Sequence, residues 1–380
     1  MTTAFVVNSG SSSIKWQWVD VATGEALQSG QVTRIGEPGS GAADHESGMR
    51  GILEQLDGSL PTVIGHRVVH GGSEFSEATL VTSVVEARIE ALSSLAPLHN
   101  PANLAGIRAA RAAFPGVPNV AVFDTAFHHT LSPAAYTYAI DPRIAARHGV
   151  RRYGFHGTSY QYVAGRAALV LGRPLETLKL IAFHLGNGAS VCAIDGGRSV
   201  DTSMGMTPLA GLVMGTRSGD IDPGALLHLG RGGLGFAEID ALLNRGSGML
   251  GLTGTGDLRD VQNAADNGDD SARLALDVYV ARLRHYLGAY LVLLGGGGGG
   301  GGGGVDAIVF TAGVGENSRE VRAAALAGLG GFGIQLDSAR NDAPSRGERR
   351  ISADSSRVQV LVIPTNEEFE IARQSLAAVG

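Results

Sequence analysis

The segment Phe5–Trp16, FVVNSGSSSIKW, decides the fold. A short apolar run ends in Asn, Gly and Ser residues and then continues as alternating apolar and polar residues. This layout predicts a β-hairpin with strands over 4–8 and 14–20. Asn, Gly and Ser are typical of any tight turn, because glycine tolerates positive φ and the other two bond their own backbone. A turn rich in backbone N–H groups can equally hold a phosphate, so both interpretations are open at this point.

The same layout returns in the second half of the chain. An apolar strand over 178–185 breaks at Gly186-Asn187-Gly188-Ala189-Ser190, and further strands follow to Asp195 and over 198–202. The two hairpins share almost no residues, yet mixed strands and helices follow each of them. We therefore expect two similar α/β domains that face one another across a cleft.

Other elements are expected from apolar periodicity and turn signals. Strands are predicted over 63–69, 119–124, 305–310 and 358–363, and helices over 84–95, 102–113, 159–171, 274–294 and 366–378. Residues 36–48 are expected to form a loop. Residues 311–317 are expected to form a turn before a helix, with capping boxes at Asn317/Glu320 and Thr365/Glu368.

Composition narrows the class of protein. A chain of 380 residues is long enough for two domains, and its net charge of −6 argues against a nucleic-acid partner. No basic segment precedes an apolar run at the N-terminus, and no apolar run approaches the ~20 residues that span a bilayer. We expect a cytoplasmic protein without membrane segments. The single cysteine, Cys192, is expected in the core, and the run Gly295–Gly304 is assigned no function.

Phosphate binding is favoured by several glycine-rich turns taken together. No P-loop motif occurs, and a G-x-G-x-x-G at 328–333 follows a helix and is interpreted as a helix end and turn. However, glycine-rich turns follow predicted strands at 9–13, 186–190 and 313–315. Three such turns in two similar domains favour phosphate binding over a purely structural role.

A resemblance to the acetate kinase family rests on nine segments that occur in the family's order between about residues 4 and 370. They are NSGSSSIK, GHRVVHGG, PLHNPANL, FDTAFHHTL, YGFHGTS, HLGNGAS, DTSMGMTPLAGLVMGTRSGDIDPG, FTAGVGENS and PTNEE. The resemblance implies a member of the acetate and sugar kinase, Hsp70 and actin superfamily. Its fold would be two ribonuclease-H-like domains, each a mixed β-sheet flanked by helices, with an interdomain nucleotide cleft. The expected N-terminal lobe is 1–147 plus about 366–380. The expected C-terminal lobe, 148–365, would bind nucleotide and form a homodimer.

The implied reaction is reversible transfer of the ATP γ-phosphoryl group to acetate, which gives acetyl phosphate and ADP by direct in-line attack of the carboxylate. A carboxylate is already ionised at pH 7, so the enzyme needs no general base. Catalysis then consists of positioning and electrostatics, with Mg²⁺ and arginine as the means. Mg²⁺ is the implied metal, with Mn²⁺ able to replace it, and ATP and ADP are co-substrates.

The resemblance also carries roles onto particular residues. Arg67 would orient acetate, Arg217 would contact the phosphoryl group in the transition state, His156 would donate a hydrogen bond to it, and Asp124 would serve the metal or orient substrate. The metal site would comprise Asn8 and Glu367, and the acyl pocket Val69, Leu98, Phe155 and Pro208. The nucleotide-binding residues would be Lys15, His184, Leu185, Gly186, Asn187, Gly188, Asp257, Leu258, Arg259, Gly313, Val314, Gly315, Glu316 and Asn317. Ser11 and Ser13 match the first phosphate region, His99 would line the site, and His128 and His129 are interpreted as structural.

Three alternatives stay open. A propionate or butyrate kinase differs only in the acyl pocket, where one methylene changes specificity by about 10–200-fold. A sugar kinase would use Asp124 as a base. An Hsp70- or actin-like ATPase would need a peptide-binding domain or a polymerisation surface, and no such domain remains after two lobes. The physiological direction is left open as well.

Overall fold

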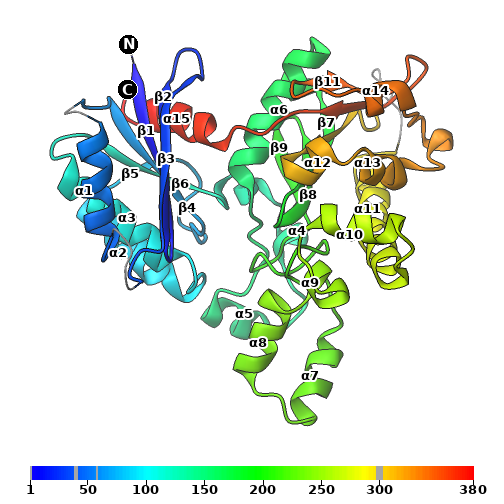
Figure 1. Ribbon diagram of the computed structural model, residues 1–380, viewed down its shortest axis with the longest axis horizontal. Coiled ribbons are helices and arrows are strands. Elements are labelled where there is room, and N and C mark those ends of the chain that lie inside the picture. The colour runs from blue at the N-terminus through cyan, green and yellow to red at the C-terminus, as the bar shows by residue number, and fades with distance from the viewer. Residues whose placement is uncertain (1, 38–41, 57–58, 297–302) are drawn as a thin grey trace. The chain divides into compact units, whose positions relative to one another are not determined.

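The computed structural model describes residues 2–37, 42–56, 59–296 and 303–380, which form two compact units (Figure 1). Unit 1 comprises the residues up to 129, 155–162 and 366–380. Unit 2 comprises 130–154 and 163–365. The division expected above, at residue 147, stays a prediction, because a compact unit need not coincide with an inherited domain.

Unit 1 is built on a mixed six-stranded sheet with the order β3-β2-β1-β4-β6-β5. The opening segment forms the predicted hairpin, in which β1 and β2 pair antiparallel and β3 extends it. β4 and β6 then add parallel to β1, and β5 closes the edge antiparallel to β6. The strands are β1 (Thr3–Gly10), β2 (Ser13–Asp20), β3 (Ala26–Thr33), β4 (Val63–Val68), β5 (Thr79–Leu80) and β6 (Asn119–Phe123).

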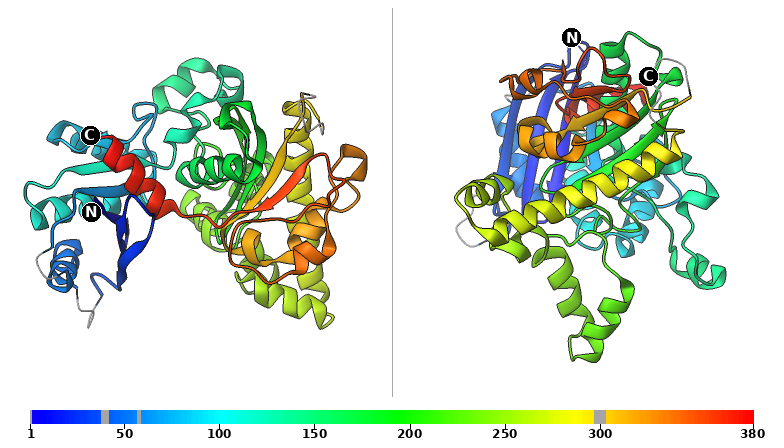
Figure 2. Two further views of the ribbon diagram at one scale, coloured as in Figure 1. Left: turned by 90° about the horizontal axis from the view of Figure 1, so that it is seen from above. Right: turned by 90° about the vertical axis from the view of Figure 1, so that its right-hand side faces the viewer.

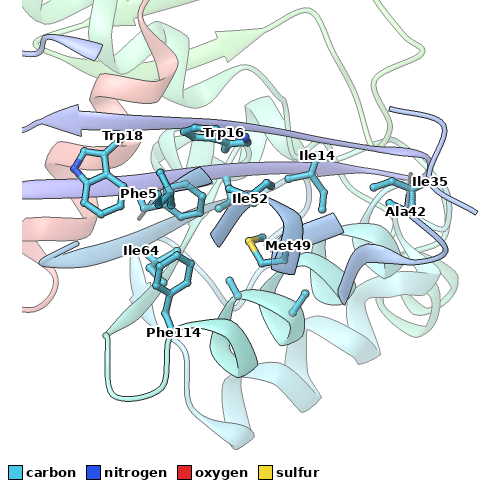
Figure 3. Packing of buried hydrophobic residues seen from close by; sticks show 14 residues of the cluster. Phe5, Ile14, Trp16, Trp18, Ile35, Ala42, Met49, Ile52, Ile64 and Phe114 are labelled. Carbon is cyan, nitrogen blue, oxygen red and sulfur yellow. The ribbon is translucent and has the colours of Figure 1, made fainter. Parts of the chain in front are cut away.

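The side chains of β1 point alternately to the two faces of the sheet, and this explains why helices pack on both faces. Phe5 lies in a buried cluster with Trp16, Met49 and Phe114, which the sheet forms with α1 and α3 (Figure 3). Its neighbours on β1 lie in a second cluster with Ile371 of α15. Successive strand residues point to opposite faces, so one strand anchors helices on both sides. The helices are α1 (His45–Gln55), α2 (Ser83–Ala91), α3 (Asn100–Ala113) and α15 (Glu367–Ala377), and α15 is drawn in red (Figure 2).

Unit 2 repeats the plan with the strand order β11-β12-β10-β7-β8-β9. Its hairpin β7–β8 extends antiparallel to β9, while β10 and β12 add in parallel and β11 closes the edge. The strands are β7 (Lys179–Leu185), β8 (Ala189–Asp195), β9 (Arg198–Thr202), β10 (Ala307–Thr311), β11 (Arg349–Arg350) and β12 (Gln359–Val362). Each strand has a counterpart at the same place in unit 1, which confirms the predicted pair of similar domains.

The helices of unit 2 are more numerous than the sequence predicted. They are α4 (Pro133–Tyr136), α5 (Pro142–His148), α7 (Pro223–Arg231), α8 (Phe236–Arg245), α9 (Gly248–Thr253), α10 (Leu258–Asp266), α11 (Asp270–Leu293), α12 (Ala312–Asn317), α13 (Arg319–Leu326) and α14 (Ser338–Asp342). The α6 helix (Gly157–Leu171) contributes residues to both units. The long helix α11 is yellow in the right-hand view of Figure 2. No helix of the described residues is both long enough and apolar enough to cross a membrane.

Three local predictions were wrong. Residues 45–48 belong to α1, because Asp44 caps that helix by accepting a hydrogen bond from Ser47 N. Residues 312–317 form α12 rather than a turn. The caps shift by one residue, because Ser318 caps α13 and Asn366 caps α15.

Other local predictions were confirmed. Cys192 is a buried free thiol, and residues 328–333 form a turn after α13. Within the run Gly295–Gly304, residues 297–302 lie outside the described residues.

His66 on β4 predicts how the stability of unit 1 depends on pH. Its side chain is 2% exposed and its Nε2 lies 2.7 Å from Asn119 Oδ1 on β6. Burial lowers the pKa of His66 from 6.5 to about 4. The unfolded chain therefore takes up a proton at higher pH than the folded chain does. The free energy of unfolding should therefore fall by about 2 kcal/mol through this residue as the pH falls from about 7.5 to about 5.

The measurement is urea unfolding of the parent and of His66→Gln at both pH values. Glutamine does not titrate, so the free-energy difference between the two proteins should shrink by about 2 kcal/mol at the lower pH. An unchanged difference would show that His66 is not held neutral by the fold.

Candidate functional site

An ion pair between Arg67 and Asp124 lies at one edge of the unit 1 sheet. Arg67 is the penultimate residue of β4 and Asp124 directly follows β6. Because these strands are parallel, their carboxyl ends meet at the same edge. Arg67 Nε donates to Asp124 Oδ1 at 3.0 Å, and Nη2 donates to Oδ2 at 2.6 Å. The Asp124 side chain is buried and accepts a bidentate pair of hydrogen bonds.

Two more predicted residues converge on Arg67. Its Nη1 lies 3.4 Å from Asn8 Oδ1 at the hairpin, and its Nε lies 4.0 Å from Glu367 Oε2 at the start of α15. Burial disfavours the charged form of Arg67, but the carboxylates of Asp124 and Glu367 outweigh burial and raise its pKa. The structure thus brings together Asn8, Arg67, Asp124 and Glu367 from four separate segments, with Arg67 held as a cation.

The Glu367 carboxylate is partly buried, with 21% of its side chain exposed, and lies near the Arg67 guanidinium group. Burial raises its pKa, Arg67 opposes that effect, and the neighbouring Glu368 adds to it. A cation close to Glu367 would further stabilise its charged form. Glutamate and amide oxygens are hard ligands, and Mg²⁺ typically uses one or two carboxylates with phosphate oxygens and waters completing the shell. Asn8 and Glu367 therefore fit a magnesium ion. Within the described ranges, no group of three or more His, Cys, Asp or Glu side chains could hold a metal by itself.

Two asparagines of α3 hold this edge in place, and the sequence analysis did not single them out. Asn103 Nδ2 donates to Ser9 O at 2.7 Å, while its Oδ1 accepts from Val69 N at 3.0 Å. Asn100 bonds both the N–H and the C=O of His70. These contacts fasten the end of β1 and the segment after β4 to the same helix turn. Their burial and their partners follow from tertiary packing, so the sequence carried no signal for this role.

His156 is held beside Asp124 through the backbone. Gly157 N donates to Asp124 O at 2.9 Å, and a Cβ at Gly157 would lie 2.4 Å from that oxygen, so only glycine fits. His156 itself has a φ of 59°, which is uncommon for a residue with a side chain. Backbone strain of this kind persists where surrounding contacts enforce it, and it clusters at functional sites.

The residues expected around the acyl group lie in both units. Val69 and Phe155 are buried in unit 1, and the Phe155 ring meets His70 edge-on at 5.6 Å. His128 Nε2 donates to Phe155 O, in keeping with the structural role expected for it. Leu98 is 49% exposed. Pro208 belongs to unit 2, so the acyl pocket stays a proposal.

A cavity of about 930 Å³ in unit 2 collects most of the predicted nucleotide-binding residues. Those that line it are Gly186, Asn187, Asp257, Leu258, Arg259, Gly313, Val314 and Asn317. The residues that sequence reasoning missed are Met214, Gly215, Met249, Gly256, Gln262, Asn263, Asp266, Tyr279, Ser318 and Glu320. The cavity is thus formed by the turn after β7, the first turns of α10 and α12, and side chains from α9 and α11.

The remaining predicted nucleotide-binding residues do not line this cavity. His184 and Leu185 end β7, and Gly188, Gly315 and Glu316 are neighbours of lining residues. Lys15 lies in unit 1 on β2, paired with Asn8 across the hairpin. Ser11 lies in the hairpin turn and Ser13 begins β2, whereas His99 precedes α3.

Two local features shape the cavity. Asp257 caps α10 and accepts from Arg259 N and Nε, and hydrogen bonds from Arg259 lower the pKa of Asp257 to about 2. Gly215 lies where two other segments come close together. A Cβ at this position would lie 2.0 Å from Asn187 Oδ1 and 3.0 Å from Gly256 O. Glycine is thus required for these segments to approach one another.

Arg217 lies in the irregular segment after β9, and the structure brings it to a second predicted residue. Its Nη1 donates to Pro208 O at 2.6 Å. Burial lowers the pKa of Arg217, and no carboxylate of the described chain forms an ion pair with it. Its remaining N–H groups are therefore available to an anion.

Gly215→Ala should weaken nucleotide binding. The added methyl group must displace the Asn187 side chain from the cavity wall, so the dissociation constant for ADP should rise about 10-fold, as measured by isothermal titration calorimetry. Gly288→Ala is the matched control, since a Cβ at Gly288 in α11 meets nothing within 4 Å. If Gly215→Ala bound ADP like the control, this cavity would not be the nucleotide site.

Comparison with known proteins agrees with this geometry. Residues 3–373 match the model of the acetokinase family. The chain is 60% identical, over the full length of both, to an acetate kinase from Leifsonia xyli subsp. xyli. A Porphyromonas gingivalis acetate kinase structure superposes with a TM-score of 0.95 at 40% identity over all of both chains. A propionate kinase from Francisella tularensis gives 0.91 at 36% identity, covering 99% of this chain and 100% of its own. The resemblance stated from the sequence is confirmed, and the chain belongs to the acetokinase family.

Proposed function

We propose that this protein reversibly transfers the γ-phosphoryl group of ATP to acetate, giving acetyl phosphate and ADP by in-line attack of the acetate carboxylate. The observation that carries the proposal is the 60% identity to an acetate kinase over the whole chain. The paired Arg67 and Asp124, and the separate cavity of unit 2, supply groups of the kinds that this reaction needs.

The state of Asp124 bears on the acceptor. Both of its carboxylate oxygens accept hydrogen bonds from Arg67, and such bonds stabilise the ionised form and make it a poor base. A sugar hydroxyl would need that base, whereas acetate is already ionised. We therefore assign Asp124 to orienting Arg67. The N–H groups of Arg67 that are not used by Asp124 would hold the acetate carboxylate.

Charge on the transferring phosphoryl group would be stabilised by Arg217 and His156. Arg217 has donors to spare, because within the described residues its guanidinium group donates to one carbonyl oxygen, Pro208 O. A guanidinium group suits phosphoryl oxygens because its donors form a planar fork. His156 is fixed by its strained backbone beside Asp124. Transfer between two anions needs such donors rather than proton abstraction.

The nucleotide would occupy the unit 2 cavity, and the metal would lie near the hairpin of unit 1. At about 930 Å³ the cavity is within the range of small-molecule sites. Asn8 and Glu367 would hold Mg²⁺, with Mn²⁺ able to replace it. When bound, the metal would neutralise phosphate charge.

A homodimer formed through unit 2 is also proposed. Leu227 in α7 and Phe236 in α8 are 64% and 94% exposed, and large apolar side chains gathered on a surface are typical of interfaces. Phosphoryl transfer, as proposed here, does not depend on this assembly.

Propionate is a second candidate substrate. The full-length structural match includes a propionate kinase, and a methylene in an apolar pocket changes specificity only modestly. We expect acetate to be preferred and propionate to react measurably.

The test is hydroxylamine trapping of the acyl phosphate with Mg-ATP and acetate, propionate, butyrate or glycerol. Acetate should give the strongest signal. Arg217→Ala should reduce it by roughly 10²–10³-fold, because a donor to the transition state is lost.

Arg143→Ala is the matched control, since the Arg143 side chain is 88% exposed and, among the described residues, pairs with Asp141 alone. It should retain parental activity. ATP hydrolysis without acyl phosphate from any carboxylate would contradict the proposed reaction and favour an ATPase.

A further inference from the structure

A second cavity, of about 450 Å³, lies in unit 2 at the end of α12. It is bounded by α12, α13 and α14, which are orange in Figure 1, and by the segment that leads into β11. Four arginines line it, namely Arg319, Arg322, Arg346 and Arg349. It shares only Asn317 with the larger cavity.

Arg322 is a buried cation that forms no ion pair with a carboxylate among the described residues, although the charges of Glu320 and Asp342 act on it from farther away. Its side chain is 1% exposed. Its Nη1 donates to Gly315 O and Glu316 O, and its Nε and Nη2 donate to Asn341 Oδ1 and O. Burial lowers its pKa to about 10, and the nearby charge of Arg349 contributes. Carbonyl groups solvate a guanidinium group but do not neutralise it, so the site keeps positive charge.

Arg349 is likewise held by hydrogen bonds to backbone carbonyl oxygens. Its Nη2 donates to Glu316 O at 3.2 Å, and its Nη1 donates to the carbonyl oxygens of Ser345 and Gly347. Its Nε is buried and has no hydrogen-bond partner in the part of the chain that the structure describes. An unsatisfied buried N–H is costly, and a bound acceptor would remove that cost.

The charge around the cavity favours an anion. Glu316 and Asp342 line it and Glu320 pairs with Arg319 from outside, so the four arginines keep an excess of one positive charge. Glu316 Oε1 accepts from Thr365 N. A phosphate group carries about −1.5 to −2 charges at pH 7 and is bound by guanidinium forks through several short hydrogen bonds.

We propose that this cavity binds a small molecule through its phosphate group, at a site separate from the nucleotide cavity. Arg349 would donate from its unsatisfied Nε, and Arg322 would supply its positive charge and the one Nη2 N–H that the chain does not use. Arg346 would contribute from the exposed rim. Because Arg322 and Arg349 also hold the last carbonyl groups of α12, a bound phosphate would contact the same side chains that support one wall of the nucleotide cavity.

The experiment is calorimetric titration of inorganic phosphate into the full chain with ADP at saturation, so that the nucleotide cavity is filled. Parental protein should bind phosphate. Arg349→Gln and Arg346→Gln should each weaken binding about 10-fold or more. Arg346 makes no hydrogen bond or ion pair within the described residues, so its replacement leaves the fold's own contacts intact.

Arg350→Gln is the matched control. It removes the same charge from the adjacent residue, which pairs with Asp354 and does not line the cavity, and it should bind phosphate like the parent. If phosphate binding weakened equally in this control, the cause would be a general loss of positive charge, and the proposed site would be wrong. Absence of binding to the parent, or undiminished binding to Arg349→Gln and Arg346→Gln with ADP affinity intact, would overturn it too.

Discussion

The bidentate pair between Arg67 and Asp124 is the interaction on which the unit 1 site depends. A buried carboxylate is tolerated only when it is paired, and removing one partner of such a pair typically costs about 3–5 kcal/mol. The pair therefore requires β4 and β6 to end side by side. It also fixes where Asn8 and Glu367 can approach, because both contact the same guanidinium group. One ion pair thus links hairpin, sheet and C-terminal helix.

The duplicated topology explains why candidate sites lie where strands end. In open sheets with parallel strands, ligands bind outside the carboxyl ends of those strands. Unit 1 places Asp124 after β6, and unit 2 places Gly186 after β7 and Gly313 after β10. The units differ in what they present there. Unit 1 presents charged side chains, whereas unit 2 presents a large cavity with backbone and polar groups. That difference fits one unit acting on a small anion and the other holding a nucleotide.

Apolar periodicity predicted most of the central strands, since they are buried on both faces and flanked by turn residues. It missed β3, whose largely exposed polar residues carry no apolar alternation. It also missed α12, since Ala-Gly-Val-Gly is typical of a loop, and Arg322 from a later helix binds the carbonyl groups at its end. Family motifs located the charged cluster. The wall residues Met249 and Tyr279 and the bracing Asn103 could not be predicted, because tertiary packing alone brings them there.

A double-mutant cycle tests most directly whether Asp124 acts through Arg67 rather than on the substrate. The quantity is kcat/KM for acetate in the parent, Arg67→Gln, Asp124→Asn and the double variant, with urea unfolding to confirm that each is folded. If Asp124 orients Arg67, Asp124→Asn should lower kcat/KM markedly in the parent and hardly at all once Arg67 is replaced. Losses that multiply independently would contradict this account and assign Asp124 a role of its own.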